Sequence, residues 1–515
     1  MPHSSDETFD AVLVGATAGA LIAAIKLAEF GLRPLVLEKA AKVGGGTAYS
    51  GGIVWAPKNH RMVMKGVPDS FEEARRYLAQ VSHGSGDPDQ ARVYVETVGA
   101  ALLYVEACTS LKWATYRGLP DYWAEYEGGK LEGRFLLPLP WRPSSLGLHD
   151  GEVRGLLSLP GREGDWVWGR ALIGALYETA LFLEVPIRLN QRALGLVGHL
   201  RALRGVRVAR EDGSEYDVYG RRGVLLNTGG FEWNEEWTSR WIKGPRPQPQ
   251  TPPSNEGDGH AMLIKLGVPL DMMDRTIAIP GVLIPHGSND GRELWRVFFQ
   301  PLARPRSMVV NRAGRRFANE SFFVELVQAM QFVNSDGLAP NNPAYFVWDN
   351  EYERRYGRPG EIPIEMVIEA SSVEELASRC AIPPSALRDD VLKFNISVRS
   401  GSPDQFHRGS TAYSRAFGDP TSHINPTLGP VEEPPFRAVP IHVTTAGHRG
   451  GAIIDVHARV IGADGDPIPG LYACGNVVAG RLTGREYFSG VSTGHALVFG
   501  ILAAEDMIKR HDTNR

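Results

Sequence analysis

The sequence predicts an α/β fold built around a parallel β-sheet, from three observations. Ala11–Val14 is a short apolar run beside a glycine, which is typical of a buried parallel strand. Leu21–Glu29 follows with apolar residues at helical spacing, and Pro34–Glu38 is a second apolar strand closed by an acid. Further apolar strands at 223–226 and 471–473 indicate that later parts of the chain return to the same sheet.

The turn Gly15–Ala20 between the first strand and its helix predicts a site for a dinucleotide. The N–H groups and dipole of a helix N-terminus favour a pyrophosphate, which makes this unit Rossmann-like. Glu38 lies where a carboxylate accepts ribose hydroxyls. Thr17 and Ala20 occupy slots that usually hold glycine, and Thr17 crowds the approach of phosphate to the backbone. A plain buried βαβ unit is the alternative interpretation.

Two glycine clusters that follow the second strand favour FAD over NAD as the dinucleotide. The runs 44–47 and 50–52 follow the ribose-binding acid and let the backbone approach a large flat ligand. Later contacts are expected from small residues after the strand at 223–226, from the start of a helix near 258, and from the start of the last helix, whose N–H groups stabilise negative charge. His260 is interpreted as structural. The expected cofactor-binding residues are Gly15, Thr17, Ala18, Ala20, Glu38, Lys39, Gly45, Gly46, Thr47, Ser50, Gly51, Gly52, Thr228, Gly229, Asp258, Gly475, Asn476 and Ser492.

Length and composition indicate an ordinary globular enzyme of two or three domains. The chain has 515 residues, 43% hydrophobic and 22% charged, and a net charge of −4 that gives no general attraction to nucleic acid. Its three cysteines lie far apart, which argues against a disulfide framework. The sequence contains no metal-binding, nucleophile-elbow or P-loop pattern and no evident signal or transmembrane segment. We therefore expect a cytoplasmic protein without a metal.

Local patterns place the remaining elements in order. Asp69 or Ser70 is expected to cap the helix at 72–81. Asp212-Gly213 is expected to form the turn of a hairpin or small meander. Ala313-Gly314 is expected to close a second hairpin. The predicted helices are 72–81, 90–110, 169–183, 261–266, a stretch around 365–377, and one from Ser492 or Thr493 to 508. The predicted strands are 185–189, those of the meander at 193–218, 308–311 with 316–320, 345–348 and 459–462.

An aromatic loop interrupts the helical pattern between residues 111 and 141. Tyrosines and tryptophans cluster between Trp113 and Trp123, and Tyr126 follows. Such a loop either packs as structure or lines a pocket for an apolar ring with a tyrosine hydroxyl inside it.

Six runs spread over nearly the whole chain carry a family resemblance. They are GGGTAYSGGIVWAPKN (44–59), LLNTGGFEWN (225–234), VVNRAGRRFANES (309–321), RGSTAYSRAFGDP (408–420), PPFRAV (434–439) and IPGLYACGN (468–476). With them the chain resembles the fumarate reductase/succinate dehydrogenase flavoprotein superfamily, in its 3-ketosteroid Δ1-dehydrogenase-like branch. The resemblance implies non-covalent FAD, because the first glycine cluster lacks the histidine of covalent members. It also implies a discontinuous FAD-binding domain, 1–275 and 440–515, with an α+β catalytic domain inserted at 276–439.

The same resemblance implies roles for particular residues. Tyr487 and the backbone N–H of Val491 would polarise a ketone oxygen, and Tyr122 of the Asp-Tyr pair would assist proton abstraction. The family base falls at Val324, which has no hydroxyl. Either Tyr122 takes that role, or Tyr116 or Tyr126 does, or the bond that reacts is different.

The implied reaction is the desaturation of a cyclic ketone to an enone, with loss of an α-proton and a β-hydride. The substrate would be a 3-ketosteroid or a smaller oxo-cyclohexane carboxylic acid, and the electron acceptor, whether oxygen, a quinone or a dye-like molecule, is unidentified. Arg485 or Arg304 would hold a carboxylate in a fork, unless these arginines are simply solvated or paired. Phe323 and Trp123 complete the expected substrate-binding residues.

Two alternatives remain open at this point. The first is fumarate-reductase-type reduction of an α,β-unsaturated acid, against which Tyr487 and the aromatic loop argue. The second is a flavin-binding protein without turnover, which the missing base at Val324 keeps open.

Overall fold

A mixed, largely parallel β-sheet, here called the first sheet, forms one half of the protein. The computed structural model describes residues 7–143, 166–200, 202–422 and 425–510. The strand order is β19-β20-β9-β1-β2-β6, in which β20, β9, β1, β2 and β6 run parallel and β7 and β8 extend β9 as an antiparallel meander. The strands are β1 (Glu7–Val14), β2 (Pro34–Leu37), β6 (Ile187–Arg188), β7 (Arg192–His199), β8 (Ala202–Ala209), β9 (Glu215–Leu226), β19 (Arg459–Ile461) and β20 (Pro467–Ala473). Strands from both ends of the chain thus share one sheet, as predicted.

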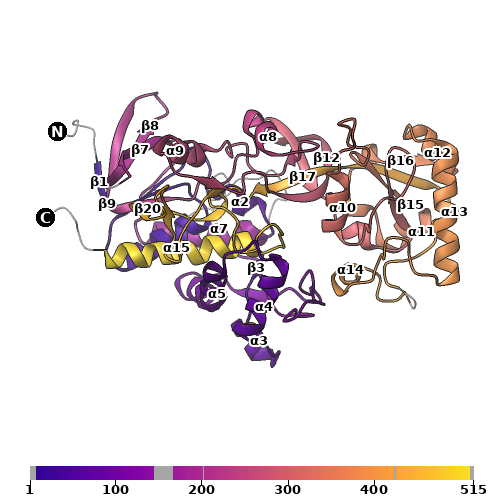
Figure 1. Cartoon of the computed structure of the whole chain (residues 1–515), viewed down its shortest axis with the longest axis horizontal. Helices are drawn as coiled ribbons and strands as arrows, with labels where there is room; N and C mark the ends of the chain where they lie inside the picture. The colour runs from indigo at the N-terminus through magenta and orange to yellow at the C-terminus, as the bar shows by residue number, and fades with distance from the viewer. Residues whose placement is uncertain (1–6, 144–165, 201, 423–424, 511–515) are drawn as a thin grey trace.

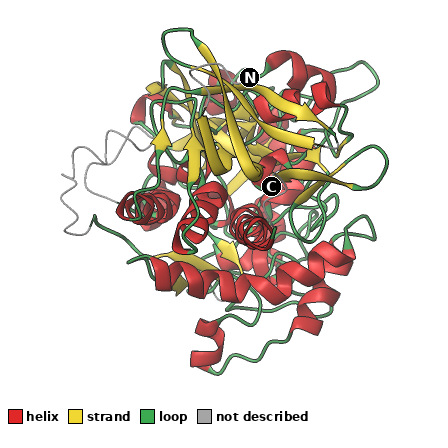
Figure 2. Ribbon diagram, turned by 90° about the vertical axis from the view of Figure 1, so that its left-hand side faces the viewer, coloured by secondary structure: helices red, strands yellow, loops and turns green. Residues whose placement is uncertain are grey.

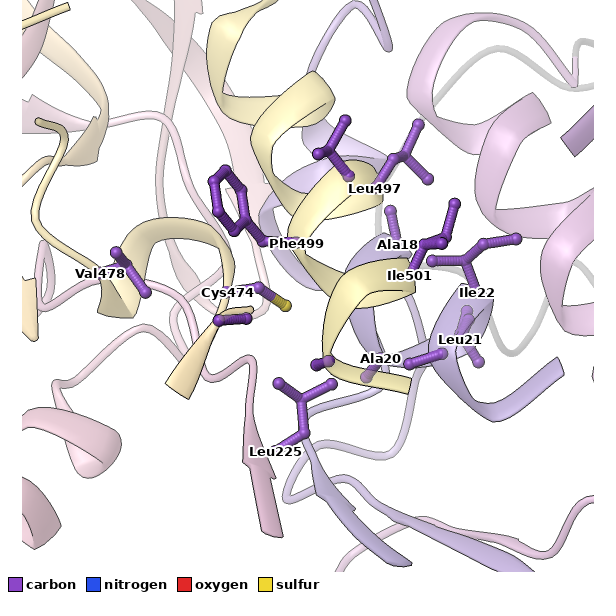
Figure 3. Packing of buried hydrophobic residues seen from close by; sticks show 14 of the residues in the cluster. Ala18, Ala20, Leu21, Ile22, Leu225, Cys474, Val478, Leu497, Phe499 and Ile501 are labelled. Atoms are coloured by element: carbon purple, nitrogen blue, oxygen red, sulfur yellow. The ribbon is translucent and has the colours of Figure 1, made fainter. Parts of the chain in front are cut away.

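Helices cover the first sheet, and two of them touch through glycine. α1 (Ala18–Glu29) lies beside α15 (Val491–Lys509), and a Cβ on Gly500 would stand 2.4 Å from the carbonyl oxygen of Gly19. Figure 2 shows helices gathered against one side of the strands. Figure 3 shows labelled apolar side chains of these two helices packed together, with Cys474 beside them and Leu225 below. Small residues at this contact therefore let the first and last helices approach closely.

The second sheet lies at the other end of the molecule (Figure 1). Its path is β13-β12-β17-β15-β14, with β10 and β16 also paired to β17. The strands are β10 (Gln248–Pro249), β12 (Thr276–Asn289), β13 (Arg292–Val297), β14 (Ser307–Val310), β15 (Ala344–Trp348), β16 (Ile368–Ala370) and β17 (Phe436–His448). Helices α10 (Phe323–Met330), α11 (Asn350–Tyr356), α12 (Val373–Arg379), α13 (Pro384–Ser400) and α14 (Ala412–Ala416) belong to this part, as do η1 (Gln300–Ala303), η2 (Pro359–Glu361) and η3 (Ile364–Met366). Two buried apolar clusters form the core of this part.

Smaller elements connect these parts and surround the aromatic loop. Ser70 caps α4 through the backbone N–H of Glu73, and Asp87 caps α5 in the same way. The helices are α2 (Gly45–Tyr49), α3 (His60–Lys65), α4 (Phe71–Val81), α5 (Pro88–Cys108), α7 (Trp168–Phe182), α8 (Glu235–Trp241), α9 (Asp258–Leu266) and η4 (Gly475–Val477). Short strands are β3 (Val54–Trp55), β4 (Trp113–Thr115) and β5 (Phe135–Pro138) in one sheet, and β11 (Leu270–Asp271) with β18 (Gly451–Ala452) in another.

The predicted hairpin of 308–311 with 316–320 is wrong. Asn311 and Gly314 form the expected turn, but β14 pairs with β15 instead of with 316–320. Arg316 and Glu320 instead face a buried ion network, with Nη2 and Oε2 2.8 Å apart. The stretch around 365–377 is likewise divided among η3, β16 and α12, because Ser372 starts a new helix by capping the N–H of Glu375.

Within the described residues, one helix has the length and apolar character of a membrane span. α15 has 19 residues, and 67% of its apolar window is buried inside the protein. Its position beside α1 under the first sheet explains this apolar character without a membrane.

Candidate active site

The first turn is closed by contacts to the end of β9. Gly15 has φ +98°, and a Cβ there would stand 2.4 Å from the carbonyl oxygen of Asn227. The Asn227 side-chain oxygen accepts hydrogen bonds from the hydroxyl of Thr17 and from the N–H of Ala20, the latter at 2.9 Å. Thr17 therefore points its hydroxyl at Asn227. This orientation accounts for a threonine at a position where the sequence predicted crowding of the phosphate.

Glu38 lies directly beside this turn. Its carboxylate accepts hydrogen bonds of 2.9 Å from the backbone N–H groups of Ala16 and Ala40. Burial raises the pKa of Glu38, and these hydrogen bonds oppose the rise. Lys39, the next residue, pairs with Asp258 at 2.7 Å at the start of α9. Two predicted cofactor residues that are distant in sequence are thus in contact.

The second glycine cluster packs against the first turn. A Cβ on Gly45, which has φ +44°, would stand 2.8 Å from the Thr17 methyl group. Gly52 has φ +62° and would meet the backbone N of Gly169 at 2.7 Å. Thr47 and Ser50 form the turn between these glycines, where the Ser50 hydroxyl donates to the Thr47 carbonyl at 2.8 Å. Gly46 lies in α2, and Gly51 follows that helix.

Thr228 and Gly229 follow β9 and extend the candidate cofactor-binding surface formed by the first turn, Glu38 and the second glycine cluster. The Thr228 hydroxyl is buried without a hydrogen-bond partner among the described residues, and a Cβ on Gly259 would stand 2.1 Å from it. Gly229 has φ +72° and adjoins the side chain of Asn255. The orphaned hydroxyl, the closely approached glycines and the start of α1 fit a dinucleotide cofactor.

The end of the chain completes this surface. Gly475 has φ +72°, and a Cβ there would meet the Asn227 amide nitrogen at 2.6 Å; that amide also donates to the carbonyl of Cys474 at 2.9 Å. A small cavity of about 30 Å³ lies next to it. It is lined by the predicted residues Gly475, Asn476, Tyr487, Val491 and Ser492, together with Arg449, Val478, Ala479, Gly480, Leu482 and His495.

Tyr487 and Val491 lie together in this cavity, as predicted. α15 begins at Val491 after Gly490, which has φ +88° and whose Cβ would stand 2.5 Å from the backbone N of Trp55. The N–H of the first residue of a helix has no partner within the helix, so Val491 can donate to a ligand. Burial raises the pKa of Tyr487, and the nearby Tyr122 adds to the rise, while a hydrogen bond with Ser492 and the charge of Arg449 oppose it.

Arg449 is a site residue that the sequence analysis missed. Its guanidinium donates to the carbonyls of Glu486, Gly480 and Gly484, at 2.6, 2.6 and 2.9 Å, and lies 5.8 Å from the centre of the Tyr487 ring. No carboxylate lies within ion-pair distance of it in the described part of the chain. Burial lowers the pKa of Arg449 to about 10. Arg449, the residue after β17, thus holds in place the turn that carries Tyr487.

The aromatic loop meets this turn through Tyr122. The Tyr122 hydroxyl and the Ser489 hydroxyl are 2.7 Å apart. Asp121 anchors the loop by accepting hydrogen bonds of 2.8 Å from Trp55 and from Arg134. Burial raises the pKa values of Asp121 and of Tyr122. The loop therefore holds the Tyr122 hydroxyl beside the start of α15.

Aromatic rings surround Tyr122. The Phe323 and Trp123 rings have their centres 5.7 and 6.0 Å from that of Tyr122. Tyr413, which the sequence analysis did not select, is closer, at 4.1 Å. Tyr116 is at the edge of this group, and its hydroxyl accepts a hydrogen bond of 3.2 Å from Gln300. Two predicted substrate-binding residues and two candidate bases thus lie together.

The two predicted arginines occupy different surroundings. Arg304 donates to the carbonyl of Gly418 at 2.9 Å and lies 5.2 Å from the centre of the Tyr356 ring, so its guanidinium is engaged. Arg485 is exposed in the turn before Tyr487. Val324 is buried in an apolar cluster at the start of α10, so the family base position offers no acid or base.

A larger hollow lies elsewhere, at the end of the second sheet. It has a volume of about 640 Å³ and is lined in part by Arg306, Tyr356, Asp404 and Arg415. None of the predicted site residues is among its described lining residues. The chemistry is therefore assigned to the smaller cavity at the start of α15.

The fold and the site define a flavoprotein, and comparison with known proteins agrees. The family model described as "FAD binding domain" matches residues 10–493, so the chain belongs to that family. It is an FAD-dependent oxidoreductase that acts on CH–CH bonds. The predicted family resemblance and the predicted FAD cofactor are confirmed.

Three named proteins place the chain within this class. It is 33% identical to the 3-oxosteroid 1-dehydrogenase of Mycobacterium tuberculosis (strain CDC 1551 / Oshkosh), over 98% of each chain. It is 31% identical to the 4-oxocyclohexanecarboxylate 2-dehydrogenase of Sinomonas cyclohexanicum, over 96% of this chain and 92% of that protein. The crystal structure of 3-ketosteroid Δ1-dehydrogenase from Sterolibacterium denitrificans in complex with 1,4-androstadiene-3,17-dione superposes with a TM-score of 0.88 and 27% identity, covering 98% of this chain and 100% of that one.

Proposed function

We propose that this chain desaturates a cyclic ketone to an enone, removing an α-proton and a β-hydride. The observation that carries the proposal is the 2.7 Å contact between the hydroxyls of Tyr122 and Ser489. This contact joins the aromatic loop to the turn that bears Tyr487, so a group able to take a proton and a group able to polarise a carbonyl meet at the start of α15.

Each proposed role follows from a group at that helix start. The Tyr487 hydroxyl and the Val491 N–H donate to the ketone oxygen, where negative charge develops when the α-proton leaves. Tyr122 is the proton acceptor, because Val324 cannot act as one, Tyr116 lies at the edge of the aromatic group, and Tyr126 is stacked on Trp123 with ring centres 6.2 Å apart. Bound FAD supplies the acceptor for the β-hydride.

The cofactor is proposed to lie non-covalently along the first sheet. The start of α1 would hold the pyrophosphate, Glu38 the ribose, and the segments around Thr228 and Asn476 the flavin. This makes residues 1–275 and 440–515 a Rossmann-like FAD-binding domain with an α+β domain, 276–439, inserted in it. The two sheets support the division in outline: β12, a long strand of the second sheet, begins at Thr276. Two strands cross the proposed bounds, because β10 (Gln248–Pro249) pairs with β17 and β17 itself runs from Phe436 to His448.

The substrate is proposed to be a 3-ketosteroid or a smaller oxo-cyclohexane carboxylic acid, the compounds named for two relatives. Arg485 is the better candidate for a carboxylate ligand, because it is exposed two residues before Tyr487 while Arg304 is engaged elsewhere. We expect Arg485→Ala to raise KM for the acid substrate and to leave kcat nearly unchanged. An unchanged KM would exclude this role.

The electron acceptor is proposed to be oxygen, a quinone or a dye-like molecule, and the place of action the cytoplasm. The proposed electron acceptor rests on the family resemblance. The proposed location rests on the burial of α15 within the protein.

Anaerobic mixing tests the proposed function directly. The purified yellow protein would be mixed with a 3-ketosteroid, with 4-oxocyclohexanecarboxylate and with succinate, while the visible absorbance band of the flavin is followed. Bleaching by a ketone with recovery of an enone is the expected result, and the ketone that responds identifies the ring. Bleaching by succinate alone would move the assignment to fumarate-type chemistry.

A further inference from the structure

Tyr413 is a second tyrosine that lies directly beside the proposed base, Tyr122. Its ring centre is 4.1 Å from that of Tyr122 with the planes at 45°, and the two hydroxyls are hydrogen-bonded. Both side chains are almost completely buried, at 1% exposure each. The Tyr122 oxygen is therefore shared between two hydroxyl neighbours, Tyr413 and Ser489.

Tyr413 is held in place from both sides. It lies in α14, which Thr411 and Ser414 cap reciprocally. The N–H of Ala412 donates to the Glu125 carboxylate at 2.8 Å, which ties α14 to the aromatic loop. The orientation of Tyr413 toward Tyr122 is thus fixed by the helix cap and by the loop that carries Tyr122.

The electrostatics give the two tyrosines different roles. Burial raises the pKa of Tyr122, and hydrogen bonds from Ser489 and Tyr413 oppose that rise because they favour the ionised form. Burial raises the pKa of Tyr413, and the interaction with Tyr122, including the same hydrogen bond, adds to the rise. Tyr413 therefore stays a protonated donor, and Tyr122 is the member of the pair that ionises first.

We propose that Tyr413 is a positioning residue that makes Tyr122 the proton acceptor, in place of the hydroxyl that position 324 lacks. The inference rests on the proposed function. Tyr122 first releases its proton to solvent. Its phenolate then takes the α-proton, and the electron pair of the broken C–H bond forms the new double bond. FAD, held at the first sheet, would supply the acceptor for the β-hydride and its electron pair.

The titratable groups that face Tyr122 come from several elements. Tyr77 lies on α4, Tyr116 follows β4, Tyr487 lies in the turn before α15, and Tyr413 lies on α14. The Asp121–Arg134 ion pair, at 2.8 Å, lies behind the loop. Tyr413 is the tyrosine in this group that hydrogen-bonds to the Tyr122 hydroxyl.

The experiment compares Tyr413→Phe and Ser489→Ala with the native holoenzyme. Each variant removes one donor to the Tyr122 oxygen, so the midpoint of the rising limb of kcat/KM against pH should move up by about one unit. At a pH below that midpoint the rate should fall about tenfold. Tyr352→Phe is the matched control, because it removes a buried hydroxyl bound to the carbonyl of Pro301 and should leave the midpoint unchanged.

A second readout does not depend on turnover. With 3-fluorotyrosine placed at position 122 of the holoenzyme, the fluorine NMR shift reports the ionisation of that side chain against pH. Tyr413→Phe should move the midpoint of this titration upward by the same amount. The FAD content, measured by absorbance, should stay unchanged. An unmoved titration overturns the inference. If no ketone bleaches the flavin, the proposed function fails, and the fluorine titration still reports whether Tyr413 controls Tyr122.

Discussion

At the scale of single residues, Asn227 illustrates what sequence alone did not reveal. Its amide joins the first turn, the end of β9 and the segment after β20, through Thr17, Ala20 and Cys474. A polar residue directly after a buried parallel strand is the signal that could have identified it, because ligands bind at that edge of such sheets.

Residues selected by motif and residues selected by packing differ in how well sequence predicts them. Tyr122, Tyr487 and Val491 were implied by the family resemblance, and the structure places them near one another at the start of α15. Arg449 and Tyr413 were missed, since each acts through a partner far away in sequence and neither has a local pattern. Spacing along a chain does not encode which side chains face each other across two sheets.

Tyr487→Phe tests the donor to the ketone oxygen. Losing one preorganised donor typically costs about 2.7–4 kcal/mol of barrier, so kcat should fall by roughly 10²–10³-fold. Steady-state kinetics on the ketone that bleaches the flavin measures this. Tyr472→Phe is the control, because that hydroxyl binds Asp506 at 2.7 Å at the other end of α15. A kcat within twofold of the native value would remove Tyr487 from the mechanism.

At the scale of elements, sequence predicted those that local patterns specify. The strands of the first sheet and the helices α1, α4, α5, α7 and α15 lie close to their expected ranges, because periodicity and caps are local. The hairpin closed at Ala313-Gly314 was wrong, since strand partners depend on distant residues. Arg316 and Glu320 were instead required for buried ion pairs with Asp404 and Arg408.

Gly490→Ala tests how the start of α15 is placed. The new Cβ would stand 2.5 Å from the backbone N of Trp55 at φ +88°, so we expect the unfolding free energy to fall by about 1–3 kcal/mol and the turn carrying Tyr487 to shift. Gly267→Ala is matched in backbone conformation, with φ +83°, but nothing lies within 4 Å.

Denaturant unfolding and kcat, measured on both variants, separate collision from backbone strain. The Gly490 variant should lose more stability than the Gly267 variant and should also lose activity. Equal losses of stability with equal kcat would mean that the contact with Trp55 does not position the helix.

At the scale of the whole molecule, buried histidines make stability depend on pH. Burial lowers the pKa of His260 and of His495 to about 4 and that of His448 to about 3. In the unfolded chain these side chains titrate near the ordinary value of 6.5. The unfolded state therefore binds more protons below pH 6.5, and stability present above that pH is lost as the pH falls toward 4.

We expect the unfolding free energy to decrease by up to about 2 kcal/mol per buried histidine between pH 7 and pH 5. Buried carboxyls such as Glu38 and Glu232, whose pKa values are raised, act in the opposite direction. His260→Gln isolates one contribution, because His260 bonds only the carbonyl of Gly450, at 2.8 Å, among the described residues. Denaturant titrations should show a shallower pH dependence for this variant; an identical slope would refute the contribution of His260.

The sharing of one sheet by both ends of the chain has a consequence for synthesis on the ribosome. β20 and α15 are made last, yet β20 pairs with β9 and α15 packs against α1. A nascent chain can form local helices and the second sheet as it emerges, at about 5–20 residues per second, but the first sheet stays incomplete until β20 has been made. We therefore expect flavin capture only after β20 and α15 have been made, so a ribosome stalled before residue 467 should carry a chain that does not retain the cofactor.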